Sequence, residues 1–396
     1  MKILMLSNTF PYPPTRGGTH VRTFHLMRYL QRQSSVTLIT QRTPEVTEAE
    51  IAGLRDCVDE LMVFDRPTLP PASKFQRLTE FALQGTPPSV KAGYSPAMQD
   101  WIDRAMAAGK FDVITAEHCV NEAYIRPEWR KSIRTIVNVH SSVYGTCRNQ
   151  LQTGTSENAL RDRLNLPLLY RYERNYCQKF TQIVATTPED QAQLQQFAPQ
   201  TPIAVIPNGV DFTAFPQRTS DPGGQHLMFI GAMDNLANID AAKFLCREIL
   251  PALQVRYPEV KISLVGARPP QEILDLGQNP AIQVTGAVDS MAEYLHRATI
   301  CVVPMRTGFG IKNKTLEAMA AGVPVVASDR GLEGLEIAQP ERALRANTVE
   351  AYVAAIASLF DAPDRRQAMA QAAHDYVTQS FVWEQAGAAY SAVVRG

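Results

Sequence analysis

Residues 2–40 read KILMLSNTFPYPPTRGGTHVRTFHLMRYLQRQSSVTLIT, and this stretch decides the fold class. Its first five residues form a short apolar run that breaks at Ser7, which predicts a buried parallel strand followed by a loop. After that loop, apolar residues recur every three positions from Val21 to Leu30, which predicts a helix. Residues 35–40 predict a second strand. Strand, loop, helix and strand in this order indicate a parallel sheet covered by helices.

The same alternation continues along the chain. Further strands are predicted at residues 61–64, 113–116, 135–139, 182–185, 226–230, 261–265, 282–285, 300–303 and 323–327. Turn and linker residues at 206–225 separate the two series. We therefore expect an N-terminal Rossmann-like domain at 1–205, a linker at 206–225 and a second Rossmann-like domain at 226–375. Doubly wound sheets bind ligands beyond the carboxyl ends of their strands, so two facing domains would form a cleft.

Composition narrows the function classes. The chain has 39 Lys and Arg residues against 39 Asp and Glu, which argues against a nucleic-acid-binding protein. Residues 126–179 are an exception, with 10 basic and 4 acidic residues. This region is either a solvated surface or a face for an anionic partner such as a membrane. No apolar run is long enough for a membrane span or a signal peptide, and the six cysteines are scattered. We expect a cytoplasmic protein, with peripheral contact at the inner membrane face as the sharper alternative.

The most informative stretch for function is residues 303–326, VPMRTGFGIKNKTLEAMAAGVPVV. It predicts a strand ending at Pro304, a glycine loop, and a short helix from Asn313 that ends before Gly322. A glycine loop that feeds a helix N-terminus suits a phosphate group, and Lys312 and Lys314 add positive charge there. Glu317 follows one turn later, where a carboxylate would suit ribose hydroxyls. The alternative is an ordinary strand–turn–helix with a solvated rim.

This stretch resembles the donor-binding motif of retaining family-4 glycosyltransferases, which have the GT-B fold. Further segments resemble the same family: residues 8–18, 205–215, 229–238, 284–289 and 381–383. The last of these implies that residues 376–396 form a helix that returns to the first domain. The resemblance implies transfer of a sugar from a UDP- or GDP-sugar to a hydroxyl acceptor, with retention at the anomeric carbon. It implies glycan, glycolipid or exopolysaccharide synthesis, without a bound metal or a cofactor beyond the nucleotide sugar.

The site residues follow from this resemblance. The candidate catalytic residues are His118, Lys312, Lys314 and Glu317. The candidate donor-binding residues are Gly17, Gly18, Gly231, Val288, Arg306, Gly308, Phe309, Gly310, Ile311, Asn313, Thr315 and Leu316. His140 ends the next predicted strand after His118 and resembles a second family histidine. Glu117 is expected to be a solvated loop carboxylate.

Two departures from the family pattern stand out. Most members carry an acid eight residues before the helix glutamate, where this chain has Phe309; the sequence GFGIKNK resembles a branch with GSGIKNK. Many members also grip the diphosphate with a Gly-Arg and Lys-Gly pair, where this chain has Gly-Ala-Met-Asp from Gly231. We therefore assign the cationic clamp to Lys312 and Lys314, with Lys243 and Arg306 as weaker candidates.

Three other functions stay open at this point. A nucleotide-sugar epimerase would share the fold, and Phe309 makes a non-catalytic nucleotide-sugar binder conceivable. A dinucleotide oxidoreductase is disfavoured, because no G-x-G-x-x-G follows the first strand.

Overall fold

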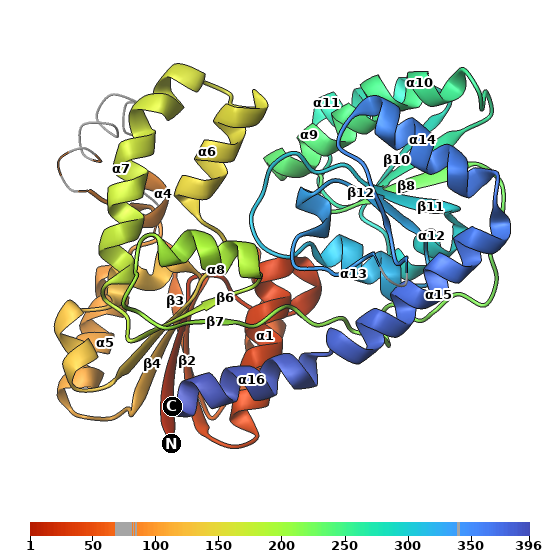
Figure 1. Cartoon of the computed structure of the whole chain (residues 1–396). Coiled ribbons are helices and arrows are strands. Elements are labelled where there is room, and N and C mark those ends of the chain that lie inside the picture. Colours follow the sequence, from red (N-terminus) through yellow and green to blue (C-terminus); the bar gives the residue numbers. More distant parts are fainter. Residues whose placement is uncertain (68–80, 82, 84, 339–340) are drawn as a thin grey trace. The chain divides into compact units, whose positions relative to one another are not determined.

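The computed structural model describes residues 1–67, 81, 83, 85–338 and 341–396. The chain forms two compact units, each an α/β sandwich (Figure 1). Unit 1 comprises Met1–Pro207 and Ala386–Gly396, and unit 2 comprises Asn208–Gln385. Most of the predicted linker at 206–225 therefore groups with unit 2, while the end of the chain groups with unit 1.

Unit 1 is built on one parallel sheet. Among its described residues the strands are β1 (Lys2–Ser7), β2 (Ser35–Arg42), β3 (Glu60–Asp65), β4 (Val113–Glu117), β5 (Arg134–Asn138), β6 (Gln182–Ala185) and β7 (Ile203–Val205). Their order is β3-β2-β1-β4-β5-β6-β7. The chain winds one way from β1 to β3 and the other way from β4, so the topological switch point lies between β1 and β4.

The helices of unit 1 connect successive strands. Those in its described residues are α1 (Gly18–Gln31), α2 (Glu48–Arg55), α4 (Pro88–Lys91), α5 (Pro96–Ala107), α6 (Val143–Thr153), α7 (Ala159–Cys177) and α8 (Pro188–Gln195). Local sequence sets their ends. Thr47 and Glu50 form a reciprocal capping box at the start of α2, and Gly154 ends α6 in the left-handed conformation.

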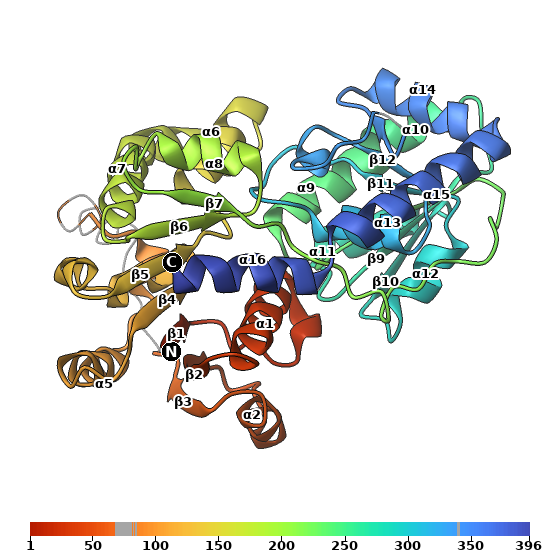
Figure 2. The same ribbon diagram turned by 60° about the horizontal axis from the view of Figure 1, so that its bottom comes forward.

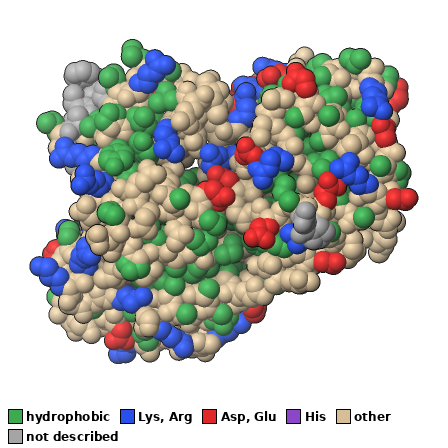
Figure 3. Space-filling view, viewed as in Figure 1, with side chains coloured by type: hydrophobic (Ala, Val, Ile, Leu, Met, Phe, Trp, Pro, Cys, Tyr) green, Lys and Arg blue, Asp and Glu red, His purple; other side chains and the backbone are tan. Residues whose placement is uncertain are grey.

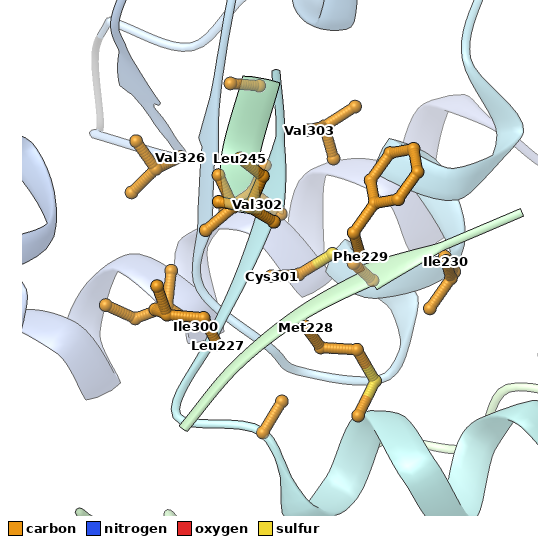
Figure 4. Close-up of a cluster of buried hydrophobic side chains, with 14 of the residues drawn as sticks. Leu227, Met228, Phe229, Ile230, Leu245, Ile300, Cys301, Val302, Val303 and Val326 are labelled. Atoms are coloured by element: carbon orange, nitrogen blue, oxygen red, sulfur yellow. The ribbon is translucent and has the colours of Figure 1, made fainter. Parts of the chain in front are cut away.

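Unit 2 repeats the same winding. Its described strands are β8 (His226–Ile230), β9 (Lys261–Val265), β10 (Ile282–Gly286), β11 (Ile300–Val303), β12 (Val325–Ala327) and β13 (Leu344–Arg345), in the order β10-β9-β8-β11-β12-β13. The switch point of this sheet lies between β8 and β11. The four central strands, β9, β8, β11 and β12, are mostly buried. Figure 4 shows Phe229, Cys301 and Val302 packed in the core around β8 and β11.

Helices also connect the strands of unit 2. The described ones are α9 (Leu236–Phe244), α10 (Leu250–Gln254), α11 (Gln271–Leu274), α12 (Met291–Arg297), α13 (Asn313–Ala320), α14 (Val349–Phe360) and α15 (Pro363–Ser380), and a π-helical turn at Leu245–Ile249 joins α9 to α10. The chain ends in α16 (Trp383–Arg395). In the described part of the chain, no helix combines the length and apolar character that a membrane span requires.

Two doubly wound Rossmann-like sheets confirm the predicted fold class. Every strand predicted from the sequence is present, within a few residues of its expected bounds. The sequence analysis missed β7 and β13, because strands of three and two residues are too short to show a hydrophobic pattern. The predicted cleft between the two domains stays a prediction.

The C-terminal part of α16 contributes to the core of unit 1. It packs against α1 in Figure 2, and a Cβ added to Gly387 would lie 2.3 Å from Cγ of Tyr29. Tyr390 is fully buried, and its hydroxyl donates to Glu117 Oε1 at the end of β4. A carboxylate without exposure to water needs such hydrogen-bond donors to offset the cost of its burial. The C-terminal part of α16 therefore stabilises unit 1.

We predict that Tyr390→Phe lowers the free energy of unfolding by about 1–3 kcal/mol, because it leaves a buried carboxylate oxygen without its donor. Denaturant unfolding measures this loss. Tyr352→Phe is the matched control: Tyr352 is almost fully buried as well, but its hydroxyl donates to no carboxylate of the described residues, so its removal should cost much less. Equal effects of the two substitutions would contradict a stabilising role for the Glu117 contact.

Candidate functional site

The loop between β11 and α13 has the form that the sequence predicts. β11 ends at Val303, α13 begins at Asn313, and Gly322 follows the helix with a φ of 70°. Gly308 and Gly310 have φ angles of 122° and 75°, which L side chains rarely adopt, so the loop requires glycine at both positions. No side chain caps the start of α13. The first amides of the helix are therefore available to donate hydrogen bonds to an anion.

The available amides are those at the very start of α13. The N–H groups of Thr315 and Leu316 already donate to the carbonyl of Lys312, and both side chains are fully buried. The structure therefore does not support a side-chain contact from Thr315 or Leu316 to the donor. The amides of Asn313 and Lys314 have no partner among the described residues, so they remain for a ligand.

Lys314 is the cation that the structure places most clearly. Its Nζ donates to Asn238 Oδ1 at 2.5 Å and lies 5.0 Å from the centre of the Phe229 ring. A Cβ on Gly231 would lie only 3.2 Å from the same nitrogen, so this lysine approaches closely because position 231 is glycine. Burial lowers the pKa of Lys314 to about 8, and the charge on Lys312 adds to the lowering. An anion bound here would restore the charged form.

Lys312 is held inside the protein. Its Nζ donates to the carbonyl of Gly310 and lies 3.5 Å from Glu333 Oε2, and the side chain is almost completely buried. Glu333 also forms an ion pair with Arg330. A diphosphate could use Lys312 only by competing with Glu333, so its role in the clamp stays a prediction.

Glu317 lies one helical turn beyond Lys314, and its carboxylate accepts no hydrogen bond from the described residues. The residue is half-buried. Burial raises the pKa of Glu317 to about 7, and the nearby Lys314 opposes that shift. A carboxylate without internal donors is suited to accept hydrogen bonds from a ligand.

The two weaker clamp candidates are occupied by ion pairs. Arg306 donates from Nε to Asp240 at 2.9 Å and lies over the ring of Phe244. Lys243 forms an ion pair with Glu272. Both charges are already paired, so Arg306 and Lys243 could bind a phosphate only by leaving their partners, and their role in the clamp stays a prediction.

The other predicted donor contacts lie around the same strand ends. Phe309 is half-buried in the glycine loop, while Ile311 is buried in the core of unit 2. Val288 follows β10 and packs partly against the core. Ile311 is therefore better placed as a core residue than as a side-chain contact to a ligand.

This group of residues occupies the switch point of unit 2. Gly231 follows β8, and the glycine loop follows β11, the two strands between which the winding reverses. Ligands of open α/β sheets bind at this point. Gly266, which follows β9, comes so close that a Cβ on it would lie 1.9 Å from the carbonyl oxygen of Gly231. Glycine at these strand ends therefore allows the loops after β8 and β9 to approach each other closely.

Three residues that the sequence analysis did not select support the loop. Asn238 accepts from Lys314, and Glu333 pairs with Lys312. Asn208 donates from Nδ2 to Asn313 Oδ1 at 2.7 Å. The signal available in the sequence was that Asn208 and Asn238 fall within segments that resemble the family, whereas nothing marked Glu333.

Unit 1 holds the remaining candidates at its own switch point. Gly17 and Gly18 precede and open α1 after β1, and His118 directly follows β4. His118 has a φ of 81°, which is unusual for any residue except glycine. Its Nδ1 accepts from the Val120 amide, so its Nε2 carries the proton toward Ser141 Oγ at 3.0 Å. That these residues reach the same ligand as Lys314 stays a prediction.

His118 has a second histidine beside it. The rings of His118 and His140 meet edge to face at 5.4 Å, and neither ring nitrogen of His140 has a partner among the described residues. Burial lowers the pKa of His118 to about 4 and that of His140 well below its ordinary value. Both rings are therefore neutral at pH 7, which suits hydrogen bonding more than charge stabilisation.

The expectation that Glu117 is solvated is wrong. Its carboxylate is fully buried, and it accepts from Asn138 at 2.9 Å and from Tyr390. Asn138 in turn accepts from the buried Arg22 at 3.0 Å. These satisfied contacts identify Glu117 as a structural group next to His118.

Family comparisons cover most of the chain. Residues 16–214 match the model described as Glycosyltransferase Family 4, and residues 224–362 match the model described as Glycosyl transferases group 1. The chain is similar to D-inositol 3-phosphate glycosyltransferase of Segniliparus rotundus, with 27% identity over 245 residues. That match covers 54% of this chain and 53% of the relative, so the chain spans about half of the relative's length.

Solved structures match over the whole chain. Sucrose-phosphate synthase from Thermosynechococcus elongatus has a TM-score of 0.73 at 18% identity, covering 100% of this chain and 98% of that one. Anabaena HepE in complex with UDP-glucose has a TM-score of 0.65 at 15% identity, covering 100% and 99%. At these identities the likeness establishes the fold class, which is GT-B.

The position of Lys314 predicts how anion binding responds to pH. Inorganic pyrophosphate should bind the protonated lysine, so its affinity should fall as the pH rises above about 8, where free Lys314 loses its proton. Isothermal titration calorimetry between pH 7 and about 9.5 measures this.

Lys314→Arg is the control, because arginine keeps its charge over that whole range. Pyrophosphate ionises identically in both titrations, so only the lysine protein should show the additional loss. Parallel pH profiles would argue against contact between Lys314 and the anion.

Proposed function

Because the chain belongs to glycosyltransferase family 4, we propose that it transfers a sugar from a nucleoside-diphosphate sugar to a hydroxyl acceptor with retention at the anomeric carbon. One observation carries the proposal. Lys314 Nζ, the free amides that begin α13 and the bare backbone at Gly231 meet at the switch point of unit 2. This combination suits a diphosphate.

Stabilisation of the leaving group is the main chemical task of this site. Breaking the bond to the anomeric carbon leaves negative charge on the nucleoside diphosphate. Lys314 and the helix amides are fixed before reaction begins, so little reorganisation is needed as that charge develops. In this proposal a phosphate oxygen takes the acceptor proton, as the family resemblance implies, because the carboxylate assigned to the site, Glu317, is assigned to the ribose hydroxyls and not to the anomeric carbon.

Glu317 supplies specificity for the nucleoside part of the donor. Its carboxylate accepts no hydrogen bond from the described residues. It lies one helical turn from Lys314, the cation assigned to the diphosphate, so we assign Glu317 to the ribose hydroxyls. UDP- and GDP-sugars are the proposed donors, and the solved complex of HepE with UDP-glucose supports a uridine donor as the first to test.

Unit 1 is the proposed acceptor domain. His118 and His140 are neutral and lie at its switch point, where they could orient hydroxyl groups. The proposed acceptor is a glycan, a lipid-linked sugar or a small molecule with a hydroxyl group, in glycan or glycolipid synthesis. A cytoplasmic, metal-independent reaction is part of the proposal. Among the described residues, no cluster of three or more His, Cys, Asp or Glu side chains could hold a metal ion.

Phe309 favours one other function for the same site. It occupies the position where most members have an acid, and its ring cannot accept a hydrogen bond from the donor sugar. A protein that binds the nucleotide sugar without transferring it would fit this substitution. Incubation of the protein with donor alone also tests the epimerase alternative, which would convert the sugar nucleotide without an acceptor.

A thermal-unfolding screen against UDP-, GDP-, ADP- and TDP-sugars tests the proposal. The donor should raise the unfolding temperature in proportion to the logarithm of its concentration, because it binds only the folded protein. Product analysis with hydroxyl acceptors then separates transfer from binding. Stabilisation without turnover across the acceptor panel would support the binder, and no stabilisation by any nucleotide sugar would refute the proposal.

Substitutions should separate the two roles within the site. Lys314→Met should lower kcat on the order of 10²-fold, because it removes a charge that stabilises the leaving group. Glu317→Gln should instead weaken nucleotide binding by about 1–3 kcal/mol. Steady-state kinetics and calorimetry measure the two effects.

Lys243→Met is the matched control for the clamp, since that lysine is already paired with Glu272. It should leave both kcat and nucleotide affinity close to wild type. A loss with Lys243→Met as large as with Lys314→Met would show that the clamp has been assigned to the wrong lysine.

A further inference from the structure

Half of the ten basic residues between Arg126 and Lys179 have polar partners inside unit 1. Ion pairs hold Arg126 to Asp103, Arg161 to Asp162 and Lys179 to Glu122, and Arg130 and Arg134 donate to backbone carbonyls. The positive excess of this region is therefore not spread evenly over its surface. Of the five basic side chains without an ion pair or hydrogen bond to the described residues, three lie on one helix, α7.

The exposed charges on α7 are all positive. Arg163, Arg171 and Arg174 are exposed, and no ion pair or hydrogen bond engages their side chains within the described residues. The two acids of the helix, Asp162 and Glu173, are buried and accept hydrogen bonds from neighbouring hydroxyl groups. An anionic partner would therefore meet three free guanidinium groups and no free carboxylate on this helix.

Leucines lie on the same face as these arginines. Leu160 and Leu164 are 71% and 61% exposed, which is unusual for large apolar side chains. Positions 160, 164, 167, 171 and 174 are spaced by four and three residues, so they line one side of the helix. Figure 3 shows hydrophobic side chains interleaved with Lys and Arg side chains over the part of unit 1 that contains α6 and α7. We call residues 160, 163, 164, 167, 171 and 174 the α7 stripe.

We propose that the α7 stripe docks unit 1 on the surface of an anionic lipid bilayer. Arginines bind lipid phosphates, and leucines enter the boundary between headgroups and acyl chains. Exposed leucines would gain nothing from a nucleic-acid backbone. A symmetric pair of chains would place the same positive stripe against itself. The proposal narrows the contact predicted for residues 126–179 to one helix face, and it does not depend on sugar transfer.

Vesicle sedimentation tests the proposal without any turnover. The full chain should sediment with vesicles of phosphatidylglycerol and phosphatidylcholine at low salt, and should remain in solution with phosphatidylcholine alone. Binding should weaken as salt rises, because the attraction is screened. Arg163→Gln/Arg171→Gln/Arg174→Gln should reduce the partition coefficient at least tenfold, and Leu160→Gln/Leu164→Gln should reduce it severalfold.

Matched variants control for total charge and total apolar exposure. Arg55→Gln/Arg66→Gln/Arg247→Gln removes the same charge from exposed arginines elsewhere, and Val255→Gln/Leu274→Gln removes exposed apolar side chains from unit 2. Both controls should bind vesicles like wild type. Unchanged unfolding temperatures would show that all variants are folded.

Several results would overturn the proposal. Failure of the wild-type protein to bind the anionic vesicles would contradict it. Loss of binding in the charge-matched control as severe as in the stripe variant would contradict it as well. Light scattering could instead show a dimer that Leu160→Gln/Leu164→Gln disrupts, which would identify the stripe as an interface between copies of the chain.

Discussion

The ammonium group of Lys314 sits where two apolar strands, β8 and β11, end side by side, and the rest of the candidate site is arranged around that cation. The strands themselves are filled with buried aliphatic and aromatic side chains, so they have no room for polar chemistry. Polar groups therefore gather at the carboxyl ends, where the winding of the sheet reverses. Gly231 leaves space for the lysine, and Asn238 fixes its direction.

Two glutamates, the buried Glu117 and the half-buried Glu317, show how internal hydrogen bonds separate a structural carboxylate from a candidate for ligand binding. Glu117 in unit 1 accepts hydrogen bonds from Asn138 and Tyr390, so the cost of burying its carboxylate is offset within the fold. Glu317 in unit 2 has no such donors among the described residues, and burial raises its pKa to about 7. The first is complete without a ligand, whereas the second leaves its oxygens for one.

Local features of the sequence predicted the fold and the shape of the candidate loop. The glycine loop, the start of α13 at Asn313 and its end before Gly322 were all predicted from residue type and spacing. Partners from distant parts of the chain could not be predicted in this way. Arg306 was a weaker candidate for the cationic clamp, and no local pattern indicated that Asp240, 66 positions earlier, is its partner. Glu117 looked solvated because Tyr390, 273 positions later, is invisible to any local pattern.

The passage of the chain between the two units has a practical consequence. Unit 1 is not one continuous stretch, because its last eleven residues come after the whole of unit 2. A fragment cut after Pro207 would lose the phenol that Glu117 requires and would expose the surface of α1 that Gly387 covers. Isolating unit 1 as a stable reagent therefore calls for grafting residues 386–396 back through a designed linker, whereas residues 208–385 are contiguous and could be expressed directly.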